Sequence, residues 1–144
     1  MGAYLNNLQD KISFEQDLPV TLTKLLEFVM EKEKVFDYEI GVSLVDDRAI
    51  SELNAKYRKV NAPTDVLSFP LSDDGEPLTG DIVISMEAVL RQSQDYGHSL
   101  LREVAYLLVH GLYHILGFSH DEPDEKLSMR LKEEEALRQF GIQR

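Results

Sequence analysis

The 144-residue sequence has no cysteine, no long apolar run and fewer cationic than acidic side chains. The absence of cysteine excludes a disulfide framework, and it is typical of proteins that work in a reducing cytoplasm. Residues 1–30 hold no apolar run of the kind found in signal peptides, and no segment is apolar enough to span a bilayer. We therefore expect a cytoplasmic protein with no membrane partner.

The deficit of positive charge bears on possible partners. Lysine and arginine total 15 against 26 aspartates and glutamates, which gives a formal charge of −11. A general nucleic-acid binder would normally show a basic face, so this balance argues against one. It does not exclude a nuclease whose positive charge is local, supplied by a metal ion and a few cationic side chains.

The length and the 43% hydrophobic content suit one domain over residues 1–144, and the chain shows no repeats or linkers. Period-two alternation predicts a strand over residues 35–45. Shorter strands are predicted at 66–69, closed by Pro70, and at 81–85, its antiparallel partner, and an edge strand is expected within 1–16. Residues 72–80 are expected to form the turn between the two short strands.

Apolar spacing predicts helices from Asp17, from Asp46 or Asp47, and over residues 86–95, 98–116 and 123–140. Their inner faces are expected to include Ile50, Leu53 and Tyr57 in the second helix, and Leu127, Leu131 and Leu137 in the last. The predicted fold is α/β (α+β), with a mixed sheet of about four strands covered by about five helices.

Histidines at three positions of one segment carry the chemistry. His110 and His114 are four residues apart in an apolar helix, so both rings lie on one face within reach of one metal ion. Gly117 can end the helix in a left-handed conformation, after which the chain can return His120 as a third ligand. Three protein ligands and one open position are typical of catalytic rather than structural zinc.

The three histidines also allow other interpretations. Buried histidines can simply be hydrogen-bonded core residues, but three at this spacing would be an unusual coincidence. A closed structural zinc site lacks a fourth ligand, because there is no cysteine and no further histidine nearby. The spacing matches the long-motif zinc proteases, yet Gly111 replaces their general-base glutamate, which disfavours a peptidase.

Four segments together resemble the YbeY family of bacterial metal-dependent endoribonucleases. They are Leu53-Asn54 with Tyr57-Arg58, residues 63–70 (PTDVLSFP), Gly80-Asp81-Ile82, and His110-Gly111-x-x-His114-x-x-Gly117-x-x-His120. The resemblance implies a YbeY-like metallohydrolase acting on single-stranded RNA in small-subunit ribosomal RNA 3′-end maturation and ribosome quality control. It also implies ribosomal RNA, the small ribosomal subunit and assembly factors as partners.

One position departs from the family pattern. Phe118-Ser119 stands where the family usually has Tyr-Asp before the third histidine. If that aspartate normally orients a ligand, we expect Ser119 to do so more weakly or Asp121 to substitute for it.

The expected cofactor is one zinc ion, although imidazole nitrogens also accept nickel, copper and iron. Zinc lowers the pKa of a coordinated water from ~15.7 to ~7, and it can polarise a phosphoryl oxygen. Arg58 is the predicted catalytic cation, since its planar fork can hold two phosphate oxygens. By exposure alone an arginine at a helix end is more often a solvated residue, and the resemblance at Tyr57-Arg58 is what favours a functional role.

Three functions remain open from the sequence. They are a metal-dependent endoribonuclease, a zinc hydrolase of another class such as a peptidase, and a non-catalytic ribosome-assembly factor with a metal-stabilised fold. No general base can be named, because Glu103 lies ~10 Å along the helix from His110. The roles of His98, Asp65 and Asp81 stay unassigned, with His98 expected either at a helix terminus or in the wall of a cleft.

Overall fold

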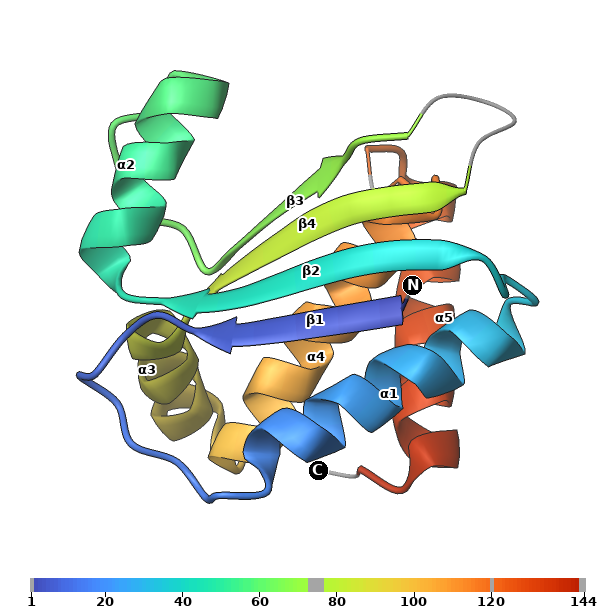
Figure 1. The fold of residues 1–144 in the computed structure, drawn as a ribbon, viewed down its shortest axis with the longest axis horizontal. Coiled ribbons are helices and arrows are strands. Elements are labelled where there is room, and N and C mark those ends of the chain that lie inside the picture. The colour runs from blue at the N-terminus through green and yellow to red at the C-terminus, as the bar shows by residue number, and fades with distance from the viewer. Residues whose placement is uncertain (1, 73–76, 120, 143–144) are drawn as a thin grey trace.

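The computed structural model describes residues 2–72, 77–119 and 121–142. These residues form four strands and five helices, which confirms the predicted α/β fold with a small mixed sheet (Figure 1). The elements in chain order are β1 (Gly2–Asn7), α1 (Leu18–Lys32), β2 (Tyr38–Val45), α2 (Asp47–Arg58), β3 (Val66–Pro70), β4 (Leu78–Ser85), α3 (Met86–Tyr96), α4 (Leu100–Ile115) and α5 (Pro123–Phe140). No helix of the described ranges is long and apolar enough to cross a membrane.

The sheet has the strand order β1-β2-β4-β3. Strands β1, β2 and β4 run parallel, whereas β3 pairs antiparallel with β4 and forms one edge. The predicted antiparallel pairing and the predicted edge strand near the start of the chain are therefore confirmed. In the β3–β4 register Ser68 lies opposite Ile82, so both side chains are directed to the same face of the sheet.

The two faces of the sheet are covered very unequally. The main core joins Ile40, Val42 and Ile82 of one face to α1, α3, α4 and α5. A second, smaller core packs Ile50 of α2 against Val83 of the opposite face. Figure 1 shows α2 on one side of the sheet and the other helices on the other side.

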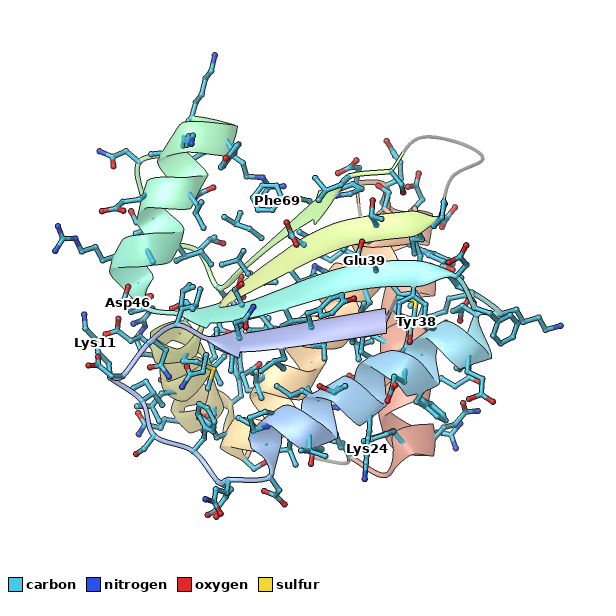
Figure 2. All side chains as sticks on the ribbon, in the orientation of Figure 1. Lys11, Lys24, Tyr38, Glu39, Asp46 and Phe69 are labelled. Carbon is cyan, nitrogen blue, oxygen red and sulfur yellow. The ribbon has the colours of Figure 1, made fainter. Side chains whose placement is uncertain are left out.

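Side-chain contacts tie α2 to the rest of the molecule. Lys11, in the segment after β1, lies 3.5 Å from Asp46, whose side chain caps α2 by accepting a hydrogen bond from the Ala49 N–H. Figure 2 shows Lys11 and Asp46 together at the base of α2, and Phe69 beside the helix on the same side of the sheet. The rings of Phe69 and Tyr57 meet edge-on, with their centroids 5.4 Å apart.

Helix α4 carries the predicted histidine motif, and its ends follow from its sequence. The Ser99 side chain caps its first turn by accepting a hydrogen bond from the Arg102 N–H. After Ile115 the chain turns at Gly117, whose φ of +101° is unfavourable for residues with a side chain. The Phe118 N–H then bonds the Tyr113 carbonyl at 2.9 Å, as in a Schellman motif. The predicted helix end at Gly117 is confirmed.

Two predicted strand starts were wrong. The strand predicted from residue 35 begins at Tyr38, because Lys34 adopts a φ of 61° and the Val35 N–H still bonds the last turn of α1. Phe36, which fitted the alternation, is 75% exposed. The strand predicted from Asp81 begins at Leu78, where pairing with β2 extends it.

Two predicted inner faces also need correction. Leu127 and Leu131 of α5 are 58% and 61% exposed, although Leu137 is buried as expected. The other buried residues of α5 are Met129, Glu133 and Ala136. In α2 Ile50 is buried and Leu53 packs against the second core, as predicted, but the inner face also includes Asn54, and Tyr57 is 57% exposed at the helix end. Both errors have one cause: the side chains directed inward include polar ones that meet polar partners, as Asn54 does in donating to the Ala62 carbonyl.

Candidate metal centre and adjoining cleft

His110 and His114 lie side by side on one face of α4, as their spacing predicted. Their ring centroids are 4.7 Å apart and the ring planes are almost perpendicular, at 84°. The third predicted ligand, His120, lies outside the described residues. Within residues 2–72, 77–119 and 121–142, no group of three histidines, aspartates or glutamates is arranged to hold a metal ion. The three-histidine site therefore remains a prediction, of which the structure describes two members.

A carboxylate from α5 fixes the orientation of the first ring. Glu133 Oε2 lies 2.5 Å from His110 Nδ1, and the Glu133 side chain is only 2% exposed. An ionised carboxylate can only accept, so Nδ1 donates and carries the proton. The ring would then bind a metal through Nε2, in the carboxylate–histidine arrangement typical of metal-ligating histidines.

The donor set therefore fits a divalent transition metal. Two adjacent imidazoles suit zinc, copper, iron or nickel, and the buried carboxylate increases the basicity of one ligand. Sequence reasoning missed Glu133 because it is one of three consecutive glutamates on a helix with little apolar patterning. Its burial depends on how α5 packs against α4, which no local pattern reveals.

The glycine between the histidines has a packing reason. A Cβ at position 111 would lie 3.1 Å from Ile82 Cγ2, so α4 approaches β4 closely at this point. In the long-motif zinc proteases this position carries the general-base glutamate. Here the position is directed into the sheet, away from solvent, so a glutamate could not reach a metal-bound substrate without displacing the helix.

The predicted cation, Arg58, lies at the end of α2. It is the last residue of α2, it is exposed, and it forms no hydrogen bond or ion pair with the described residues. Helices α2 and α4 pack against opposite faces of the sheet, and the catalytic role of Arg58 stays a prediction.

The candidates for orienting the third ligand bond to each other. The Ser119 hydroxyl donates to Asp121 Oδ2 at 3.0 Å and accepts from the Asp121 N–H at 3.2 Å. Their expected role toward His120 stays a prediction. Asp81 lies on the sheet face away from α4, where its carboxylate covers Gly41 of β2, so the structure separates it from the histidines.

A cleft of about 470 Å³ adjoins the histidine pair, between α3, α4, α5 and the residue that precedes β3. His98 and Asp65 both line it. His98 also lies between Gly97, the C-cap of α3, and Ser99, the N-cap of α4, so both alternatives predicted for it are confirmed. Tyr106 connects the cleft to the candidate centre, because it lines the cleft and its ring stacks with that of His110 at 6.0 Å. Burial, together with the charge of Glu133, raises the pKa of Tyr106 to about 12, so its hydroxyl stays protonated at neutral pH.

Comparison with known proteins identifies the family. The sequence profile of the family described as Endoribonuclease YbeY matches residues 4–141. The chain belongs to the YbeY family.

Relatives in the YbeY family are similar over almost their whole length. A protein of Carboxydothermus hydrogenoformans named Endoribonuclease YbeY is 43% identical, with 97% of this chain and 98% of the relative covered. Proteins of the same name from Clostridium tetani and from Clostridium botulinum strain Hall are 40% and 37% identical, each over 98% of this chain. The matched regions cover 98% of the Clostridium tetani protein and 99% of the Clostridium botulinum protein.

A solved structure shares the fold. The solution structure of TM1509 from Thermotoga maritima superimposes with a TM-score of 0.65 at 24% identity, over 96% of this chain and 91% of that one. At this identity the likeness bears on the fold alone.

Proposed function

We propose that this protein is a metal-dependent endoribonuclease that hydrolyses single-stranded RNA at a centre formed by His110, His114 and His120. The observation that carries the proposal is the His110–Glu133 bond beside His114, found in a chain of the YbeY family. The relatives named above bear the name endoribonuclease, which gives the substrate class.

Each residue of the centre has a distinct task. A zinc ion, or nickel or another divalent transition metal in its place, would supply an activated water and a Lewis acid for the phosphoryl oxygen. His110 would bind it through Nε2, while Glu133 holds the ring and its proton at Nδ1. His114 would supply the second nitrogen from the next turn of α4, and His120 is expected to supply the third.

Arg58 would bind a phosphate of the RNA. Its exposed guanidinium, with no carboxylate partner among the described residues, can hold two phosphate oxygens. Since α2 lies across the sheet from α4, the phosphate at Arg58 need not be the one that is hydrolysed. Arg58→Ala is expected to lower RNA cleavage at least about tenfold, the scale of one lost charged hydrogen-bond pair. Arg48→Ala on the same helix, where Arg48 is exposed and pairs with Glu52, is the matched control.

The biological substrate proposed is ribosomal RNA, in small-subunit 3′-end maturation and ribosome quality control in the cytoplasm. This part rests on the family resemblance. With a formal charge of −11, the protein gains little from general attraction to RNA. Partners such as the small ribosomal subunit and assembly factors would then present the RNA to it.

The direct test is cleavage of an unstructured RNA by purified, untagged protein. Cleavage is expected to stop when a chelator removes the metal and to return when zinc is restored. His114→Ala protein should be inactive, with circular dichroism showing that it retains its fold. Full activity of metal-free His114→Ala protein would contradict the proposal.

Two other functions predict different outcomes. A peptidase would turn over a peptide library without cleaving RNA, and the packing at Gly111 argues against it. A non-catalytic assembly factor would bind ribosomal particles equally well after alanine substitution at Arg58 and His114, with normal RNA processing.

A further inference from the structure

The cleft beside the histidine pair takes no part in the proposed hydrolysis, yet it is built from polar and aromatic side chains. It has a volume of about 470 Å³ and is contributed by three helices and the segment before β3. The lining residues that matter here are Asp65, Gln92, Tyr96, Glu103, Tyr106 and Arg130.

Glu103 is the buried acceptor in this cleft. Only 4% of the residue is exposed, and within the described ranges its carboxylate forms no hydrogen bond or ion pair. Burial raises the pKa of the Glu103 carboxyl above its ordinary value. Since no fully buried side-chain oxygen of the described residues lacks a partner, the Glu103 oxygens still reach the solvent that fills the cleft. A ligand that displaces this water must supply hydrogen-bond donors in its place.

A second carboxylate restricts what that group can be. Asp65 lines the same cleft, and its Oδ2 accepts a hydrogen bond from Gln92 Nε2 at 3.2 Å. Arg102 also lines the cleft, but its guanidinium already donates to Glu134, so the two carboxylates favour N–H donors over a phosphate at this end. The buried end of the cleft is thus suited to the donor edge of a neutral ring.

The remaining lining residues suit the other parts of a nucleotide. Tyr96 is 66% exposed at the end of α3, so its ring can stack against a planar group. Arg130 of α5 is exposed and forms no ion pair with described residues, so it can meet a phosphate at the rim. Tyr106 links this cleft to His110. A bound nucleotide would have its sugar and phosphate directed toward the candidate metal centre.

We infer that this cleft binds the guanine base of a nucleotide next to the phosphate that is hydrolysed. Guanine places two donors, the N1–H and the N2 amino group, side by side on its Watson–Crick edge, where one carboxylate can accept both. Single-stranded RNA is commonly read in this way, with a base stacked on an aromatic ring and bonded along that edge. The inference rests on the proposed endoribonuclease function and adds a base preference to it.

The other bases match Glu103 less well. Adenine and cytosine place a ring nitrogen acceptor beside their amino group, and that acceptor would face a carboxylate oxygen. Uracil has one N–H between two carbonyl oxygens, which the carboxylate would repel. A two-point contact of this kind discriminates between bases by about tenfold to hundredfold.

Nucleotide binding tests the inference without relying on cleavage. In calorimetric titrations of the whole protein, GMP is expected to bind about tenfold or more tightly than AMP, CMP or UMP. IMP, which lacks the N2 amino group, should fall between GMP and AMP. Glu103→Gln should reduce the preference for GMP to about twofold or less, because the amide offers one acceptor and one donor. Glu31→Gln, at an exposed carboxylate of α1 that does not line the cleft, is the matched control.

A second variant keeps the test decisive if Glu103→Gln protein does not fold. Tyr96→Ala alters an exposed residue and should weaken binding of all four nucleotides by a similar factor, leaving the order of preference unchanged. Equal affinities for GMP, IMP and AMP in the wild-type protein would overturn the inference. So would a full GMP preference in folded Glu103→Gln protein.

Cleavage assays separate this inference from the proposed function. Single-stranded RNAs that differ only in carrying guanosine, inosine or adenosine at one position should be cut beside guanosine most rapidly. Cleavage with no base preference, together with equal nucleotide affinities, would refute the guanine site and leave the nuclease intact. Selective GMP binding by a protein that cleaves no RNA would refute the nuclease and leave the base site standing.

Discussion

Replacing Glu133 should weaken metal binding without unfolding the protein. Its buried carboxylate accepts a hydrogen bond from His110 Nδ1 at 2.5 Å, which holds the ring and keeps the proton off Nε2. Loss of such a partner typically lowers metal affinity by 10- to 100-fold, or about 1.4 to 2.7 kcal/mol. Glu133→Gln retains an acceptor oxygen but loses the charge, so we expect a loss of about tenfold. Glu133→Ala removes the contact entirely and should approach a loss of about a hundredfold.

The assay is a zinc titration in competition with a chromogenic chelator, which reports affinity independently of RNA cleavage. Glu135→Gln is the control, because Glu135 is an exposed carboxylate on the same helix that bonds Gln139 instead of a histidine. Thermal unfolding of the metal-free variants separates a loss of metal affinity from a loss of fold. Zinc affinities of Glu133→Gln and Glu133→Ala within about twofold of wild type would refute the orienting role.

Three predictions concern stability, each measured by urea unfolding. Gly111→Ala should lower the free energy of unfolding by about 1 kcal/mol. Overpacking against Ile82 costs about 1–3 kcal/mol, and the better helix propensity of alanine offsets about 1 kcal/mol of that. A net gain in stability would contradict this and would show that the α4–β4 gap relaxes. Gly117→Ala should cost about 1–2 kcal/mol because of the φ of +101°, and an unchanged midpoint would contradict this. The Arg91 guanidinium lowers the pKa of Asp47 in the folded protein. The Asp47 carboxylate therefore stabilises the fold at pH values above its unfolded pKa of about 3.9, and this stabilisation is lost as the pH falls through the lower pKa of the folded state. Asp47→Asn should therefore cost about 1 kcal/mol at pH 7 and progressively less below about pH 3.9, and a constant difference across that range would count against it.

Local patterns predicted most of the fold. The histidine-bearing helix could be placed because its run of apolar residues leads directly to Gly117, the glycine that ends it. The antiparallel β3–β4 pair followed from two short apolar strands separated by a turn. The four-strand mixed sheet needed only the count and type of these elements.

Contacts between distant segments could not be predicted in this way. Glu133 meets His110 across 23 residues, and the leucines of α5 suggested the opposite inner face. A buried glutamate on that face is stable because it finds a histidine there, and sequence periodicity takes no account of such a partner. The cleft around Glu103 depends on four separate segments meeting, so His98 and Asp65 could be named but not placed.

The most direct test of the hydrolytic centre is anomalous X-ray scattering from crystals of the zinc-loaded protein. The predicted result is one ion at ~2.0–2.1 Å from Nε2 of both His110 and His114, with His110 Nδ1 still bonded to Glu133. Zinc bound only at other residues, or no ion between these two rings at saturating zinc, would contradict the account.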